Sequence, residues 1–343
     1  MLLAPRVSDA CAKAPPRGEE VQIAEEEALV VWDPATKTET FIRRARFSST
    51  TKSFGFLVPT PTVPTLGEAS EGIFYSLSDT IRPQVRYDRS GTTFHLGSLM
   101  WEACPVMQSK GDRGAAMPAA AVRVIATAHV AGFDATTLEA DDPTALAGWL
   151  ANHGFATTPE LTAWLAHYVN DKWKMTAFVV SSDQKEGTDF ELATRAVKMT
   201  FQTERPFYPY REPAEAPSTK LSPVTDRSLR IFFLSNDHYR AYLAEAPWHA
   251  RVLFSARTQI HGDVSEVAGG TNFVLGVFVD DQAPRRGIDE LYFAPVPSQE
   301  DIRQPPLIVH SPRDIVIPVD VILLVAFIGW RIAARRKRKK VSS

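Results

Sequence analysis

The feature that most constrains this chain is an apolar segment near its C-terminal end, Ile315 to Ala334. A helix of about 20 residues is roughly 30 Å long, which matches the hydrocarbon core of a bilayer. The central run of this segment, Val321 to Trp330, is apolar on every face. A helix that lies in the membrane surface instead carries one polar face. The segment therefore predicts a single transmembrane helix over 315–334, with the lipid bilayer as its partner.

Two charged residues, Asp320 and Arg331, oppose the insertion of this helix. Each costs about 2.5–3.5 kcal/mol at the bilayer centre and less towards either end. Twelve Ile, Leu, Val and Phe residues of the segment contribute about −0.3 to −0.6 kcal/mol each at the centre. The balance favours insertion once both charges lie near the headgroups. The alternative is a buried core helix followed by a solvated basic tail.

A run of six basic residues, RRKRKK, follows the apolar segment at 335–340, and only Arg303 and Arg313 lie shortly before it. Basic residues accumulate on the cytoplasmic side of a membrane helix. We therefore expect a single-pass protein of the cell membrane with a cytoplasmic tail over 335–343 and an extracytoplasmic body. The competing topology, a tail anchor with a cytoplasmic body, would send this basic tail across the membrane.

An extracytoplasmic body needs an export signal, and residues 1–20 resemble only the last part of one. They have no basic start, and their apolar stretch is limited to Met1–Ala4. We expect residues 1–20 to be the remnant of a signal peptide or a disordered lead. Cys11 is a poor lipoprotein site because Ser8, three positions before it, is not apolar.

Overall charge and cysteine content narrow the class of protein. The net charge is −2, and seven basic groups stand in the last thirteen residues, so the body is acidic. Nucleic-acid binding requires a basic excess, so we expect no nucleic-acid partner. Two cysteines, Cys11 and Cys104, are too few for a disulfide-dense scaffold and lack the spacing of a zinc site. A single disulfide and two separate thiols both stay open.

The body from Val21 onward shows the short β-branched runs that are typical of strands. Asp142-Pro143 and Thr158-Pro159 each combine a capping side chain with a proline at the first helical position, so each predicts the start of a helix. Gly154 is expected to end the first of these helices. A short helix is also expected over 71–79. Strands are predicted over 21–24, 28–33, 38–47, 53–59, 174–182, 193–203, 228–236, 250–258, 272–280 and 290–296.

These elements predict an α+β fold with mainly antiparallel β-sheets, a small helical insertion and one C-terminal transmembrane helix. We expect an N-terminal β-rich subdomain over 21–135, and an α+β subdomain over 136–310 with the helical pair and the later strands. The small and branched residues of 122–133 predict a buried strand. The proline-rich stretch 204–223 predicts a connection between strands or subdomains.

No motif with a recognisable chemistry stands in the chain. The eight histidines have no metal-ligand spacing, and P-loop, dinucleotide and nucleophile-elbow patterns are missing. His129 is expected to be a core histidine, and a turn explains the His261/Asp263 pair better than catalysis does. The acid pairs Asp141-Asp142 and Asp280-Asp281 suit a turn or a helix cap. Catalytic residues are therefore unknown, and no cofactor or metal is predicted; a triad from distant positions stays open.

The segments 26–77 and 146–182 resemble a known bacterial family, the domain-of-unknown-function family 2330. The likeness spans about Val21 to Tyr210 and is strongest in the strand ending Phe56-Leu57-Val58-Pro59-Thr60-Pro61 and in the segment Trp149–Tyr168. The resemblance implies an exported protein, often with a signal peptide and sometimes with a C-terminal anchor. It supplies no catalytic residue. The cysteine- and glycine-rich start of relatives is reduced here to Cys11-Ala12-Lys13.

These observations favour a non-enzymatic binding or structural module of the bacterial cell envelope. The rival hypothesis is a membrane-anchored envelope hydrolase, which a pocket joining His129 or His261 to acids and a nucleophile would support. An exposed apolar patch would favour the binding module. A third hypothesis is a subunit with an envelope protein partner, in which Asp320 pairs with a polar group of a neighbouring helix.

Overall fold

The computed structural model divides the chain into two compact units. The first unit comprises 1–82 and 113–304, and the second comprises 83–112 and 305–343. The structure describes residues 12–51, 54–88, 90, 92–97, 123–180, 191–214, 227–281, 287–297, 300–310, 313–318 and 327–332. Cys11 and Cys104 lie outside these residues, as does most of the lead over 1–20.

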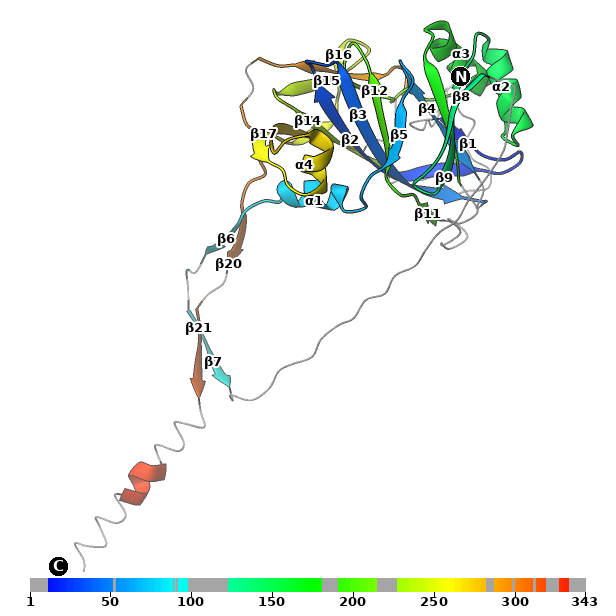
Figure 1. Cartoon of the computed structure of the whole chain (residues 1–343). Coiled ribbons are helices and arrows are strands. Elements are labelled where there is room, and N and C mark those ends of the chain that lie inside the picture. The colour runs from blue at the N-terminus through cyan, green and yellow to red at the C-terminus, as the bar shows by residue number, and fades with distance from the viewer. Residues whose placement is uncertain are drawn as a thin grey trace, which may run out of the picture. The chain divides into compact units, whose positions relative to one another are not determined.

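An eight-stranded sheet forms the centre of the first unit (Figure 1). Its order is β17-β18-β14-β2-β3-β12-β5, with β11 paired to β3. β2 and β14 run parallel, and the other pairs are antiparallel. The strands are β2 (Val21–Asp33), β3 (Thr38–Ser49), β5 (Thr65–Glu68), β11 (Glu191–Ala193), β12 (Val197–Gln202), β14 (Ser228–Ser235), β17 (Arg251–Gln259) and β18 (Asn272–Asp280). The sheet thus combines strands from both predicted subdomains.

Two smaller antiparallel sheets complete the β structure of this unit. The five-stranded sheet has the order β1-β4-β10-β9-β8, with β1 (Ala12–Ala14), β4 (Gly55–Thr60), β8 (Arg123–Val130), β9 (Phe133–Glu139) and β10 (Lys174–Val180). The four-stranded sheet has the order β13-β19-β15-β16, with β13 (Phe207–Tyr208), β15 (Tyr239–Leu243), β16 (Ala246–Pro247) and β19 (Leu291–Pro295). The predicted α+β class with mainly antiparallel sheets is confirmed.

Four helices cover these sheets in pairs. α1 (Ile73–Thr80) and α4 (Asp263–Ala268) lie side by side on one face of the eight-stranded sheet (Figure 1). α2 (Pro143–Asn152) and α3 (Pro159–Asn170) pack on the five-stranded sheet. Both predicted helix starts are confirmed, because the Asp142 carboxylate accepts from the N–H groups of Thr144 and Ala145, and the Thr158 hydroxyl accepts from that of Leu161.

The largest part of the core lies between the sheets. The aromatic side chains of Phe41 and Phe47, both on β3, pack there with Phe56, Phe178 and Phe293 from the two smaller sheets. Phe56 stacks on Phe178 with the ring centroids 4.9 Å apart. Burial of this aromatic surface is the main force that holds the layers together, at roughly 25 cal/mol per Å² of apolar area.

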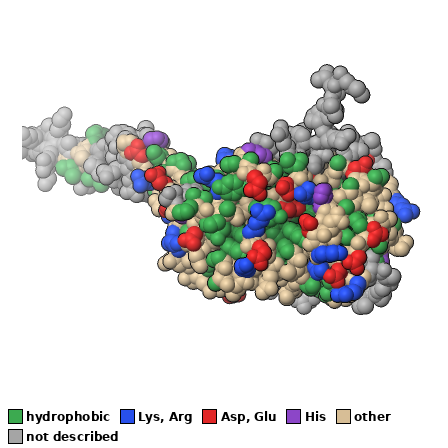
Figure 2. All heavy atoms as spheres, turned by 90° about the horizontal axis from the view of Figure 1, so that it is seen from above, with side chains coloured by type: hydrophobic (Ala, Val, Ile, Leu, Met, Phe, Trp, Pro, Cys, Tyr) green, Lys and Arg blue, Asp and Glu red, His purple; other side chains and the backbone are tan. Residues whose placement is uncertain are grey.

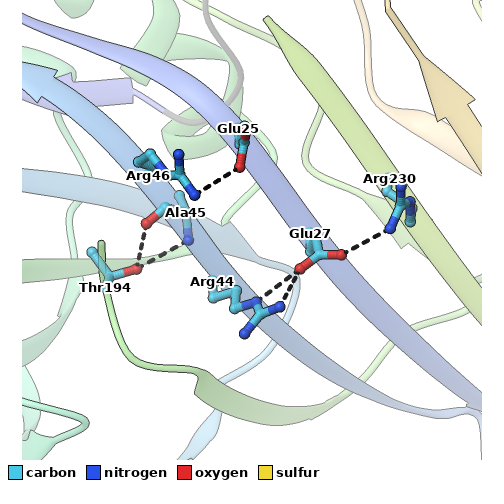
Figure 3. A network of polar contacts seen from close by, with 7 residues as sticks. All are labelled: Glu25, Glu27, Arg44, Ala45, Arg46, Thr194 and Arg230. Atoms are coloured by element: carbon cyan, nitrogen blue, oxygen red, sulfur yellow. Dashed lines mark hydrogen bonds and ion pairs between the residues drawn. The ribbon is translucent and has the colours of Figure 1, made fainter. Parts of the chain in front are cut away.

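A ladder of opposite charges joins β2 to β3 (Figure 3). The antiparallel register places Glu25 opposite Arg46 and Glu27 opposite Arg44, and both pairs form ion pairs. Glu27 also receives a hydrogen bond from Arg230 of β14. Glu26, between the two, turns to the buried side and pairs with Arg43. In the sequence TETFIRRARF of β3, apolar and charged residues therefore occur on both faces of the strand, because successive side chains point to opposite sides of the sheet.

The prediction of a buried strand over 122–133 is wrong for β8. This strand is the edge of the five-stranded sheet, and of its eight residues only Val130 is buried. An edge strand has a neighbouring strand on one side only, so its side chains stay more exposed to solvent than those of a central strand.

The second unit contains two parallel strand pairs. β6 (Val85–Asp88) pairs with β20 (Leu307–His310), and β7 (Thr92–Gly97) pairs with β21 (Arg313–Pro318). The predicted transmembrane helix is therefore wrong over Ile315–Pro318, because these residues form backbone hydrogen bonds to a second strand.

The rest of the predicted span is described only in part. Residues 327–332 are helical, whereas 319–326 (with Asp320) and 333–343 lie outside the described residues. Within the part of the chain that the structure describes, no helix is both long and apolar enough to cross a membrane.

Candidate functional site

A cavity of about 650 Å³ opens in the first unit, and we call it the aromatic cavity. Its walls come from the end of β2, the C-terminal half of α3, the segment between β12 and β13, and the four-stranded sheet. Seven aromatic residues line it: Trp32, Tyr168, Trp173, Tyr239, Tyr242, Tyr292 and Phe293. Its charged residues are Lys37, Asp171, Glu204, Arg205, Arg211, Glu245, Asp289 and Glu290, and His167 also lies in the wall.

The pairing of β15 with β19 creates one aromatic wall. Tyr242 lies directly opposite Tyr292 in the antiparallel register, so the two side chains share a face of the sheet. Both are half-buried, whereas their neighbours Ala241 and Phe293 are buried in the core. The alternation of the strand thus sends one set of side chains to the core and the other to the cavity.

A chain of rings continues this wall towards α3. The centroid of Phe207 lies 6.1 Å from that of Tyr292 and 5.0 Å from that of Trp173. Trp173 in turn lies 5.6 Å from Tyr168. The guanidinium of Arg205 lies 3.4 Å from the ring centroid of Tyr292, within the range of a cation–π interaction.

A polar cluster in the wall of the cavity is centred on Glu290. The phenol of Tyr168 donates to Oε1 of Glu290, and the backbone N–H of Arg211 donates to Oε2 at 3.2 Å. The guanidinium of Arg211 donates to Oδ1 of Asp289 at 2.6 Å and lies 3.7 Å from Oε1 of Glu290. Burial raises the pKa of Glu290 to about 7, while these hydrogen bonds and the charge of Arg211 act in the opposite direction.

His167 adds a neutral group beside this cluster. His167 is exposed on α3, but partial desolvation by its neighbours, and then the positive charge of Arg211, lowers the pKa of its imidazole from the ordinary value of 6.5. Its imidazole is therefore neutral at pH 7, with one nitrogen that donates a hydrogen bond and one that accepts.

Charged residues of both signs line the cavity. Three basic residues and five acidic ones line it, and Lys37 forms an ion pair with Glu204 at its rim. The same mixture appears on the face drawn in Figure 2, where Lys and Arg side chains stand next to Asp and Glu side chains. The cavity therefore presents donors and acceptors together rather than a field of one sign.

The histidines that the sequence singled out do not line the aromatic cavity. His129 is exposed on β8, with Nδ1 3.0 Å from Oδ1 of Asp134, so the expected core position is wrong. His261 is exposed just before α4, where Gly262 adopts a φ of 58°, and the predicted turn is confirmed. The histidine that does line the cavity, His167, stands in the last turn of α3 and had no neighbouring signal in the sequence.

The two acid pairs have different environments. Asp142 caps α2 as predicted, and Asp141 is exposed beside Lys172. Asp280 ends β18 and is buried rather than in a turn; its Oδ2 accepts from the Tyr210 phenol at 2.9 Å, and its Oδ1 lies 3.4 Å from Nε2 of His249. Among the residues that the structure describes, no group of three or more His, Cys, Asp or Glu residues could hold a metal ion.

The fold and the aromatic cavity together define an α+β protein with a ligand-sized site. The chain belongs to the bacterial family described as "Uncharacterized protein conserved in bacteria (DUF2330)", whose model matches residues 6–274. The resemblance noted in the sequence is thereby confirmed.

Two further comparisons add little. No curated protein matches the sequence. Among solved structures, the crystal structure of baculovirus P35 is similar at 7% identity and a TM-score of 0.34, over 83% of this chain and 98% of that one. A likeness this low supports no argument about function.

Proposed function

We propose that this chain is a non-enzymatic binding protein of the bacterial cell envelope, which holds its ligand in the aromatic cavity. One observation carries the proposal: a cavity of about 650 Å³ combines a wall of rings with a cluster of polar groups. Ligand sites of proteins are concave, about 300–1,000 Å³ in volume, and combine apolar and aromatic walls with polar groups that fix orientation. The volume and the ring wall of this cavity agree with that description, and its eight charged residues make it more polar than most such sites.

The envelope location is part of the proposal and rests on the sequence. The remainder of the apolar segment, 319–334, would be about 24 Å long as a helix, and with the basic residues 335–340 after it supports a single, short membrane anchor. The basic tail supports a cytoplasmic C-terminal end and an extracytoplasmic body. The bacterial distribution of the family agrees with this setting. An envelope protein partner that contacts the anchor through Asp320 belongs to the same proposal.

Thermal unfolding of the full chain tests whether the cavity binds a ligand. The protein is kept in a detergent without a sugar headgroup, and a dialysed enzymatic digest of bacterial envelopes is added. A ligand at 100 times its Kd stabilises the folded state by about 2.7 kcal/mol, so the Tm of the wild type should rise.

Two variants test whether the ligand binds in the aromatic cavity. Tyr242→Ala removes a half-buried ring of the cavity and should lose the rise in Tm. Tyr75→Ala removes an exposed ring of α1 that does not line the cavity, and should keep it. An unchanged Tm of the wild type, or an equal rise in the Tyr242→Ala variant, would overturn the proposal.

One observation favours a second function, the membrane-anchored envelope hydrolase. A carboxyl group with a pKa near 7 is suited to general acid catalysis, and burial raises the pKa of Glu290, in the cavity wall, to about 7. If this function holds, the digest should release new products on incubation with the wild type. Glu290→Gln should then abolish the release and keep the rise in Tm.

A further inference from the structure

We infer that the aromatic cavity binds an uncharged saccharide, which stacks on its rings and exchanges hydrogen bonds with its polar cluster. This inference rests on the proposed binding function and specifies the class of ligand. It follows from four properties of the cavity and its walls: the mixed charge of the lining, the half-buried rings, the polar groups beside them, and the short edges of the four-stranded sheet.

The mixed charge of the lining disfavours an ionic ligand. Basic and acidic residues line the same space, and several of them already pair with each other, as Lys37 does with Glu204 and Arg211 with Asp289. A cation entering the cavity would meet Arg205 and Arg211, and an anion would meet the acidic residues. Like charges placed together in a binding site are strongly unfavourable. An uncharged ligand meets neither penalty.

The rings provide flat apolar surfaces for a ligand of this kind. Trp173, Tyr239, Tyr242 and Tyr292 are half-buried, so each keeps part of its surface open while the core holds the rest. A pyranose ring presents a face of C–H groups, and these carry the partial positive charge that the negative face of an aromatic ring attracts. Rings held by the strand pairing of β15 and β19 are rigid, so little side-chain entropy is lost on binding.

The polar groups suit hydroxyl groups, which donate and accept at the same time. Arg211 supplies donors, Asp289 supplies acceptors, and neutral His167 supplies one of each. Charged hydrogen-bonding groups are stronger partners than neutral ones, and the pair of Arg211 and Asp289 is fixed at 2.6 Å. Adjacent hydroxyls of a sugar can therefore bond to both members of a preformed pair.

A peptide fits the same space less well. Peptides commonly bind by adding a strand to a sheet edge, which requires a run of open backbone groups. The edges of the four-stranded sheet are β13 and β16, and each has two residues. Such short edges offer too few backbone hydrogen bonds to hold an added strand.

The test compares sugar trimers that are uncharged, cationic or anionic. N,N′,N″-Triacetylchitotriose is uncharged, and the glucosamine trimer has the same backbone with charged amines in place of the acetamides; cellotriose and maltotriose add two uncharged trimers of different linkage, and the galacturonic acid trimer adds an anionic one. Binding to the full chain, in a detergent without a sugar headgroup, is followed by the fluorescence of the tryptophans. We expect at least one uncharged trimer to bind, and to bind at least about tenfold more tightly than the charged trimers do.

The variants assign the binding to the cavity. Tyr242→Ala should weaken it at least about tenfold, Tyr242→Phe should retain it because the ring remains, and Tyr75→Ala should leave it unchanged. If the trimers bind, precipitation with an insoluble polymer of the same sugar shows whether the protein takes polysaccharide or only free sugar.

The outcomes separate the two proposals. If the envelope digest raises the Tm through Tyr242 and no uncharged trimer binds, the saccharide inference is wrong and the binding function stands. If a charged trimer binds more tightly than every uncharged one, the saccharide inference is likewise wrong and the binding function stands. If neither the digest nor any trimer binds, both proposals fail.

Discussion

The phenol of Tyr168 donates a hydrogen bond to the carboxylate of Glu290, which stands 122 positions later in the chain. Both side chains are buried, Tyr168 on α3 and Glu290 immediately before β19. This contact joins the helical pair to the four-stranded sheet and forms part of the wall of the aromatic cavity. A substitution at either residue should therefore change both the free energy of unfolding and ligand binding in the aromatic cavity.

The stability of the protein should fall with rising pH because of Glu290. Burial raises the pKa of this group from 4.5 to about 7 in the folded state, so between these values the folded protein holds a proton that the unfolded chain releases. The free energy of unfolding should decrease by about 3 kcal/mol across this window, at about 1.36 kcal/mol per pKa unit. Urea unfolding of the full chain at a series of pH values measures this slope.

Two variants check the assignment to Glu290. Glu290→Gln removes the titrating group and should flatten the slope by that amount. Glu39 is also buried with a raised pKa, so a remaining slope of the same sign is expected. Tyr168→Phe removes a hydrogen bond that favours the charged carboxylate, so the folded-state pKa and with it the upper end of the window should move to higher pH. An unchanged profile in Glu290→Gln would contradict the assignment.

Removing one partner of the buried pair of Arg43 and Glu26 should destabilise the fold strongly, whereas replacing both by apolar residues should change the stability little. Their side chains are 3% and 0% exposed. Arg43→Met leaves the carboxylate buried beside a neutral side chain and should destabilise by about 3–5 kcal/mol. The double variant with Glu26→Leu should recover most of this loss, because neither charge of the pair is then buried.

The same two strands contain a control for that prediction. Arg46 pairs with Glu25 at 3.3 Å, and both side chains are about half exposed. Arg46→Ala should cost about 1 kcal/mol or less, since solvent screens the pair. If Arg43→Met and Arg46→Ala lowered the free energy of unfolding in urea by equal amounts, burial would not determine the strength of these ion pairs.

Local features of the fold were predictable from the sequence, and long-range ones were not. The starts of α2 and α3 follow from Asp142-Pro143 and Thr158-Pro159, whose effect is confined to one helical turn. The parallel pairing of β14 with β2 joins segments about two hundred positions apart, and no local pattern encodes it. The exposure of β8 depends on its place at a sheet edge, which is also a property of the whole sheet.

The aromatic cavity was not predicted from the sequence, because its walls come from segments that are far apart in the chain. Arg205 and Arg211 line it from a proline-rich stretch that we interpreted as a connection. Within that stretch Phe207, Tyr208 and Tyr210 are fully buried, so its first part is core rather than linker. The aromatic content of 207–210 was the available signal, since exposed connections seldom carry large rings at this density.

Two glycines should respond in opposite directions to alanine. A Cβ atom at Gly55 would lie 2.5 Å from the backbone oxygen of Phe178, on the neighbouring strand β10. Because a backbone atom cannot move aside without disturbing the sheet, Gly55→Ala should destabilise by about 1–3 kcal/mol. Gly148 lies exposed in α2 with no atom near its missing Cβ, so Gly148→Ala should stabilise by up to about 1 kcal/mol. Chemical unfolding of both variants tests the pair, and a stabilised Gly55→Ala would contradict the close approach.

The membrane topology should be governed by the basic residues 335–340. The full-length protein, produced with its native upstream region, is tagged at both ends, and intact spheroplasts are treated with protease. Because basic residues stay on the cytoplasmic side, we expect the body to be digested and a small C-terminal fragment to be protected. Replacing 335–340 by serine keeps the apolar run Val321–Trp330 but removes the bias, and protection of that fragment should fall. A body that resists protease in intact spheroplasts and is digested after lysis would show that it faces the cytoplasm, and the envelope part of the proposed function would then be wrong.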